Sequence, residues 1–455
     1  MSSFDLGVEG GTIVTARSRW RANLYVRDGK VALITDDRVA ANTTVKASDL
    51  LVMPGMIDCH VHFMDPGALE REDFPTGSAA AARSGVTCVI EHSHVSPVRT
   101  AGELRDKAAY MRTRSCVDFG LAAHSVAGDV DSAIGAWHAG ATFIKAFTCT
   151  THGVQGHTAG DLLRLFMASA ATNATCLVHC EDDSMLESAH RALVANGRMD
   201  GAVIPEWRDR KAEVVAVTTV AYLAQETGAH IAIAHASNPA VFDAVKPYRA
   251  AGADISVESC PQYFVLLEHE VDDRGALLKF APPARAHGAS DLELMWDRFN
   301  AGDVDFISSD HAPATIEQKR EGSIWDAPFG LPGIDTTFSI LADAASRGVI
   351  TYERLVAGYS ERPAKTYGLF PRKGSLAVGS DADFILVDPS REWTVNDDDI
   401  VSKAGWSPYS GRTLRGRSVA TYIRGFPAAV DGEVVAQPGL GQYLPGPGLS
   451  PANRT

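Results

Sequence analysis

The chain has 455 residues and a formal net charge of −14, and its balance of apolar and charged residues is that of a globular protein. The negative charge argues against nucleic-acid and anionic-membrane partners. No apolar run reaches the roughly 18 residues that a membrane-spanning helix needs, and the start, MSSFDLGVEG, has no secretory signal pattern. The seven cysteines form no C-x-x-C pair, so we expect reduced, buried thiols in a cytoplasmic protein.

The predicted elements divide the chain into three structured stretches and a tail. Residues 1–53 carry short alternating segments separated by Gly and Asp-Gly turns, which predicts the first part of a small β domain. Over residues 54–372, strand-like runs such as TCVIEH and HIAIAHA alternate with helical stretches such as KAEVVAVTTVAYLAQETG. That alternation is typical of βα units around a parallel sheet. Residues 373–436 return to short strands and complete the small β domain, and 437–455 form a Gly/Pro-rich tail that we expect to be extended or loosely ordered. The fold class is therefore α/β, with a (β/α)8 barrel flanked by a β domain built from both chain ends.

Six residues spread over the barrel region have the chemical types that hold metal ions. Most of them lie inside or at the end of short apolar runs that read as strands, and they are His60, His62, Lys145, His179, His235 and Asp310. A strand that delivers a polar side chain at its carboxyl end, repeated along a chain, describes the active-site face of a (β/α)8 barrel. Metals held at such a face lower the pKa of a bound water, which predicts a hydrolytic enzyme.

The H-x-H pair and the lysine each have an alternative reading. His60 and His62 are two residues apart, so one strand can present both imidazoles to one metal, although an isolated pair can equally be two polar residues at a strand end. Lys145 lies in the apolar run ATFIKAF, where it is either on the solvent face or buried. A buried amine has a lowered pKa and can react with CO2, giving a carbamate whose two oxygens can hold two cations.

The remaining candidates also end apolar runs. A lone histidine such as His179 or His235 is often a satisfied core residue, but two of them in register with the other candidates favour metal binding. Asp310 in FISSDHAP could cap a helix or form a turn. As a catalytic residue it would bind one metal through one oxygen and carry a proton through the other.

The sequence resembles the cyclic amidohydrolase branch of the amidohydrolase superfamily, which contains hydantoinases, dihydropyrimidinases, allantoinases and dihydroorotases. The matching motifs are PGMIDCHVHFMDPG, TGSAAAARSGVT, FIKAF, VHCED, SDHAP, GLPGIDT and GSLAVGSDADFILVD. The resemblance implies a distorted (β/α)8 TIM barrel with a small β-sandwich-like domain formed from both chain ends. It also implies two divalent metal ions, with zinc expected: His60, His62 and Asp310 on one, and His179 and His235 on the other. Carboxylated Lys145 and a hydroxide would lie between the ions, and the hydroxide would attack a ring amide carbonyl while Asp310 protonates the leaving nitrogen.

Departures from the family pattern bear on the substrate. Dihydroorotases place an arginine two residues after the second metal histidine and an asparagine near the end of the next strand. This chain has Met64 at the first position and His94 nearest to the second. Because methionine offers only a soft apolar contact, we expect a small neutral cyclic amide or imide as the substrate. The resemblance places further substrate contacts at Ser259, Cys260, Pro261, Pro332 and Gly333.

Other functions stay open at this point. They are a dihydroorotase, a mononuclear deaminase of the same superfamily, and a non-catalytic binding protein built on a hydantoinase scaffold. Lys145 argues against the deaminase, which has no bridging lysine, and the complete set of ligand types argues against the scaffold protein. We further expect a homo-oligomer, either a tetramer or a dimer.

Overall fold

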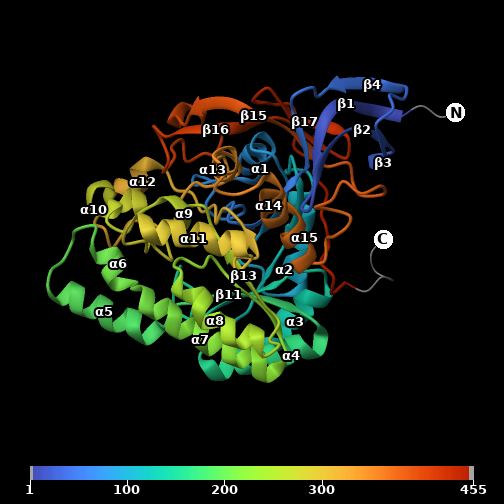
Figure 1. The fold of residues 1–455 in the computed structure, drawn as a ribbon. Helices are drawn as coiled ribbons and strands as arrows, with labels where there is room; N and C mark the ends of the chain where they lie inside the picture. The colour runs from blue at the N-terminus through green and yellow to red at the C-terminus, as the bar shows by residue number, and fades with distance from the viewer. Residues whose placement is uncertain (1–3, 450–455) are drawn as a thin grey trace.

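The computed structural model describes residues 4–449, and strands from both ends of this range share one nine-stranded sheet (Figure 1). The sheet has the order β18-β17-β16-β15-β5-β1-β2-β3, with β4 beside β1. Its strands are β1 (Phe4–Val14), β2 (Arg19–Arg27), β3 (Lys30–Thr35), β4 (Ala41–Lys46), β5 (Leu51–Pro54), β15 (Phe384–Thr394), β16 (Thr413–Ile423), β17 (Phe426–Val430) and β18 (Glu433–Val434). The two ends meet where β5 pairs with β15 in antiparallel register, and a separate apolar core that includes Phe384 and Tyr422 lies within this unit.

The central region holds two parallel sheets within the described residues. One has the order β6-β7-β8 and the other β14-β13-β12-β11-β10-β9. Their strands are β6 (Met56–Val61), β7 (Val86–Glu91), β8 (Asp118–Leu121), β9 (Ala123–His124), β10 (Ile144–Phe147), β11 (Thr175–His179), β12 (His230–Ile233), β13 (Ile255–Ser259) and β14 (Phe306–Ile307). Nearly every residue of these strands is buried, as expected for parallel strands covered on both faces.

The two parallel sheets contact each other at both of their edges. At one edge β8 and β9 are separated only by Ala122, whose N–H donates to the Glu91 carbonyl of β7, while the Ala123 N–H donates to Phe143. At the other edge a parallel bridge joins Val61 of β6 to His311, just after β14, and the His62 N–H donates to the His311 carbonyl at 2.7 Å. The strands therefore follow one another in a ring of contacts.

Helices connect the parallel strands. They are α1 (Phe74–Arg83), α2 (Ala101–Met111), α3 (Val130–His138), α4 (Ala159–Thr172), α5 (Asp183–Ala195), α6 (Val203–Trp207), α7 (Arg210–Thr227), α8 (Ala240–Ala250), α9 (Gln262–Val265), α10 (Glu270–Arg274), α11 (Ala289–Ala301), α12 (Ile316–Arg320), α13 (Thr337–Ser346), α14 (Tyr352–Val356) and α15 (Arg362–Thr366). Short turns η1 (Gly275–Leu278), η2 (Ala357–Glu361) and η3 (Asp397–Asp399) complete the set. In Figure 1 helices α4, α5, α7 and α8 lie on the side of the molecule opposite the strands of the nine-stranded sheet.

Side chains alternate between the outer and inner faces of the parallel strands. An inner apolar cluster takes one or two residues from several of the strands, among them Ile90, Phe143, Leu177 and Phe306. Because side chains on a strand share a face every second residue, the next inward position is the place where a polar residue enters the interior. Those positions hold His92, Lys145 and His179. After Phe306, the polar residue Asp310 comes four residues later.

The tail runs alongside β8 over its described part. The Phe119 N–H donates to the Gln442 carbonyl at 2.9 Å, and the Leu444 N–H donates to the Phe119 carbonyl at 2.7 Å. Glycines allow this close approach, since a Cβ at Gly441 would lie 1.9 Å from the Val117 carbonyl oxygen.

The seven cysteines are all buried and unpaired, as predicted. None of the helices within residues 4–449 combines the length and apolar character that crossing a bilayer requires.

Candidate active site

The first part of the site is the end of β6, where a bulge directs two histidines inward. The pairing of β6 with β7 changes register between Asp58 and Val61. A bulge of this kind re-aims side chains, and here it lets Cys59 and His60, which are consecutive, both contact Glu258. The ring centroids of His60 and His62 are 5.3 Å apart, so the two imidazoles of the H-x-H pair lie side by side.

Asp310, in the loop after β14, completes this group. Its Oδ1 lies 3.1 Å from His60 Nε2 and 3.4 Å from His62 Nε2. It does not cap a helix, because α12 begins at Ile316 with Thr315 as the N-cap. The backbone of Asp310 has φ 50°, an uncommon left-handed conformation that aspartate tolerates better than most residues.

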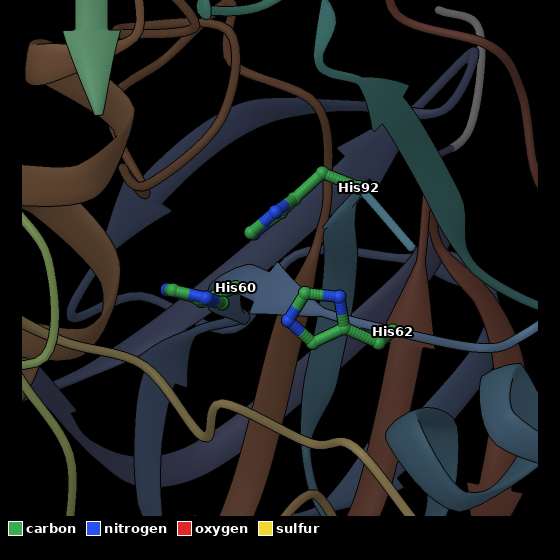
Figure 2. A group of neighbouring side chains, drawn as sticks. All are labelled: His60, His62 and His92. Carbon is green, nitrogen blue, oxygen red and sulfur yellow. The ribbon is translucent and has the colours of Figure 1, made fainter. Parts of the chain in front are cut away.

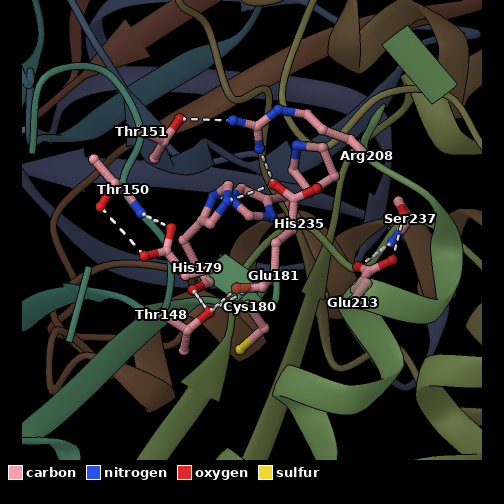
Figure 3. Close-up of polar contacts among 12 residues, drawn as sticks. Thr148, Thr150, Thr151, His179, Cys180, Glu181, Arg208, Glu213, His235 and Ser237 are labelled. Carbon is pink, nitrogen blue, oxygen red and sulfur yellow. Dashed lines mark hydrogen bonds and ion pairs between the residues drawn. The ribbon is translucent and has the colours of Figure 1, made fainter. Parts of the chain in front are cut away.

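The second group lies on β11 and β12. His179 Nδ1 is 2.9 Å from His235 Nε2, and the other nitrogen of His179, Nε2, is 2.8 Å from Glu181 Oε2. Figure 3 shows Glu181 between His179 and the guanidinium of Arg208. A carboxylate on one ring nitrogen fixes the proton there and leaves the other nitrogen as an acceptor. Both imidazoles of this group therefore turn a nitrogen toward the same point.

Lys145 belongs to both groups. Its side chain is only 1% exposed, which excludes the solvent-face alternative, and its Nζ has no hydrogen-bond partner among the described residues. Burial lowers the pKa of Lys145. Besides burial, a charge on Lys145 lowers the pKa of His60 and of His179, so the amine is within electrostatic range of both groups. A buried amine without a partner is costly unless it is neutral or modified.

The donor set fits a cation. The Glu258 carboxylate lies 2.9 Å from His60 Nδ1 and fixes the proton there, so the Nε2 lone pair faces the Asp310 oxygen, which is also an acceptor when the Asp310 carboxyl is ionised. Two acceptors 3.1 Å apart repel each other unless a positive centre lies between them. Zinc ligands at about 2.0–2.2 Å from one ion are themselves separated by about 3–3.5 Å. Burial also lowers the pKa of both His60 and His62, which keeps the imidazoles neutral and able to bind a metal.

A buried ion network supports the second group from behind. Arg285 Nη2 is 2.6 Å from Glu181 Oε1, and Arg285 Nη1 is 2.8 Å from Glu213 Oε2. Burial would raise the pKa of Glu181, but Arg208 and Arg285 outweigh it and hold the pKa below its usual range. The Glu181 carboxylate is thus kept ionised, so it can accept a hydrogen bond from the Nε2–H of His179.

Replacing Arg285 by methionine is expected to lower the free energy of unfolding by about 3–5 kcal/mol, because Glu181 and Glu213 would share a buried site with one guanidinium fewer. Urea unfolding of the metal-free protein measures the change. The matched control is Arg298→Met. It removes two ion pairs, to Asp243 and Asp303, that are more exposed than those of Arg285, and it should lower the free energy of unfolding by no more than about 1 kcal/mol. Equal losses in the two variants would contradict a special role for the buried network.

The predicted substrate contacts border the first group. The Met64 side chain is fully buried, and the Ser93 hydroxyl donates to its sulfur at 3.4 Å. His94 lies beside His62, with ring centroids 5.4 Å apart, and stacks on His152 at 4.4 Å. His152 in turn contacts Phe329, which gives this border an aromatic character. The structure thus places His94 beside His62 and Met64 against Ser93, and the contact of either residue with a substrate stays a prediction.

The other predicted contacts lie around Asp310. The Ser259 hydroxyl donates to the Ala236 carbonyl at 2.7 Å, and the Cys260 thiol is 3.8 Å from the Ser308 hydroxyl. Pro332 and Gly333 lie next to His311, whose Nδ1 accepts from the Gly333 N–H at 3.2 Å. Pro261 begins the short turn that leads into α9.

The sequence-based prediction did not include two carboxylates of the site, those of Glu258 and Glu181. Glu258 is the next-to-last residue of the run ADISVES and Glu181 follows His179 by two residues, so both lie near strand ends like the predicted ligands. Their position near strand ends was the feature of the sequence that could have identified them. Glu258 is fully buried, its Oε2 also accepts from the His235 N–H at 3.0 Å, and burial raises its pKa. It therefore ties His60 of the first group to His235 of the second.

Known proteins are similar to this chain in both sequence and structure. The sequence pattern of the amidohydrolase family matches residues 51–425. The chain is 30% identical over 453 residues to an L-hydantoinase of Paenarthrobacter aurescens, covering 97% of this chain and 98% of the relative. It is 32% identical over 443 residues to an allantoinase of Deinococcus radiodurans, covering 96% and 98%. The solved structure titled L-hydantoinase (dihydropyrimidinase) from Arthrobacter aurescens superposes with a TM-score of 0.93 at 30% identity, covering 97% of this chain and 100% of that one.

Proposed function

The chain belongs to the amidohydrolase family, and from this membership we propose that it is an enzyme that hydrolyses the C–N bond of a cyclic amide or imide. The single observation that carries the proposal is the arrangement of two histidine groups near the buried Lys145, whose Nζ has no hydrogen-bond partner within the described range. Relatives named hydantoinase and allantoinase support the same reaction class.

Two divalent cations would be held by this arrangement. We assign His60, His62 and Asp310 to one and His179 and His235 to the other, with Lys145 as a carbamate shared between them. Zinc is the metal we favour, because imidazole and carboxylate ligands suit it. When bound, the cations would supply an activated water and polarise the ring carbonyl. Burial lowers the pKa of Lys145 and so increases the share of free amine, which supports the carbamate, since only the free amine reacts with CO2.

Asp310 has the second chemical role in the proposal. Burial raises the pKa of its carboxyl, and its backbone conformation turns it toward His60 and His62. A carboxyl group that takes up and releases a proton near neutral pH can receive the proton of the attacking water and pass it to the leaving nitrogen. The protein would otherwise expel a strongly basic amide anion.

For the fold we propose a distorted (β/α)8 barrel over residues 54–372 and a small β domain from 1–53 and 373–436. The contacts at both seams of the two parallel sheets support a closed barrel. The seven buried free thiols support a reducing compartment, which we take to be the cytoplasm.

The proposed substrate is a neutral five- or six-membered ring. Met64 supplies no charge, and Arg285 is already held by Glu181 and Glu213, so it is not free for a substrate carboxylate. The charge of Arg71 contributes to the lowered pKa of both His62 and His94. Its guanidinium donates to the backbone carbonyls of Pro313 at 2.9 Å and Phe329 at 3.3 Å. A buried carboxylate without a charged partner costs several kcal/mol.

Hydantoin and dihydrouracil are therefore expected to be opened with higher kcat/KM than dihydroorotate. The measurement is ring-opening absorbance and product mass for the three compounds at one metal loading. A higher kcat/KM for dihydroorotate would mean that Arg71 or another cation binds the carboxylate. Release of ammonia with an intact ring would favour a deaminase, and the absence of turnover across a wider panel that includes allantoin would favour a non-catalytic protein.

A further inference from the structure

His92, which follows β7, has a place in the interior that the proposed function does not use. It comes two residues after Ile90, a member of the inner apolar cluster, so it enters the interior at the same level as Lys145 does after Phe143. The side chain is 1% exposed. The position is thus equivalent to those of the proposed metal ligands on the neighbouring strands.

The His92 imidazole lies as close to the H-x-H pair as the pair's two rings lie to each other. Its ring centroid is 4.3 Å from that of His60 and 4.6 Å from that of His62, compared with 5.3 Å between His60 and His62. Figure 2 shows the three rings around one shared space. One nitrogen from each of the three residues lies within 4.8 Å of the other two. The ligands of one zinc ion are separated by about 3–3.5 Å, so binding would draw the three nitrogens closer together.

Both ring nitrogens of His92 lack a hydrogen-bond partner within the described part of the chain. A histidine that merely fills the core normally satisfies its nitrogens, and His157 shows this nearby: it contacts the Ser125 hydroxyl at 3.0 Å and the Phe147 carbonyl at 3.2 Å. Leaving a buried polar group unpaired costs about 1–3 kcal/mol. A cation bound by one nitrogen of His92 removes the cost at that nitrogen.

We propose that His92 is a third imidazole ligand of the cation held by His60 and His62. The inference rests on the metal centre of the proposed function and deepens it. This cation would then have three nitrogen ligands and the Asp310 oxygen before Lys145 contributes. Such a nitrogen-rich set selects transition metals over magnesium and calcium, which prefer oxygen.

The test is the metal affinity of His92→Asn, with His157→Asn as the matched control, a buried histidine whose two nitrogens both have partners. Each full-length protein, freed of metal, is titrated with cobalt(II) against a chelator, and the visible spectrum of the bound ion is recorded. We expect His92→Asn to bind the more affected of its two ions about tenfold or more weakly, with a changed spectrum, since even groups behind the ligands contribute 10–100-fold. His157→Asn should retain both the affinity and the spectrum. Unchanged cobalt binding by folded His92→Asn would overturn the proposal.

A second measurement on the unmutated chain covers the case in which His92→Asn does not fold. With 15N-labelled histidine and bound 113Cd, NMR couplings count the imidazoles on each ion. Three imidazoles on one cadmium and two on the other support the proposal, and two on each would refute it. These readouts need no turnover, so they stand apart from a failure of the proposed hydrolase activity.

Discussion

Replacing Lys145 by alanine is expected to abolish ring opening and to lower the metal content. The lysine is buried and has no hydrogen-bond partner among residues 4–449, and its charge affects the pKa of histidines in both groups, so its loss removes the side chain that the proposal shares between the two cations. Metal analysis and kcat on one cyclic amide measure the two effects. Activity equal to that of the unchanged chain would rule out the shared site.

Chemical rescue makes the Lys145 experiment specific. A short carboxylic acid such as acetate or propionate supplies two oxygens in the space vacated by the side chain, so it should restore part of the turnover of Lys145→Ala. The matched control is Lys373→Met, which also removes a buried lysine, but one that contacts the carboxylates of Asp118 and Asp383. This control should unfold more easily and keep its metal ions, and acetate should have no effect on its activity.

Replacing Asp310 by asparagine is expected to reduce kcat by about 10²-fold or more while most of the metal is retained. The amide can still offer an oxygen to a cation and tolerates the left-handed backbone at this position, but it cannot carry a proton. General acid–base catalysis typically contributes 10²–10⁴-fold, which sets the expected size of the loss. Steady-state kinetics at saturating substrate, with metal content determined on the same sample, measure it.

Asp305→Asn provides the control for Asp310→Asn. Asp305 precedes β14 at the end away from the site, where its carboxylate accepts from the Val257 N–H at 2.8 Å and pairs with Arg249. This variant should lose stability without a change in kcat. If Asp310→Asn turned over as fast as the unchanged chain, the proton would have to travel through another group.

The sequence determined the reaction class and the types of the site residues. A strand that is buried on both faces must be apolar, and this requirement is local, so runs such as CLVH and FIK could be read without knowing their neighbours. The polar residue that ends or interrupts each run then stood out. His60, His62, His179, His235 and Asp310 were found in this way, and the structure brings them into two groups beside Lys145.

The tertiary structure alone decided which strand ends lie side by side. Glu258 contacts His60 across 198 residues of sequence, and Arg285 reaches Glu181 across 104, so no spacing along the chain announces either contact. The bulge in β6 that turns both Cys59 and His60 toward Glu258 is likewise a property of the pairing with β7. The place of His92 beside the histidine pair follows from the same order of strands. Local burial thus fixes what each strand contains, while long-range packing of the strands fixes which side chains meet.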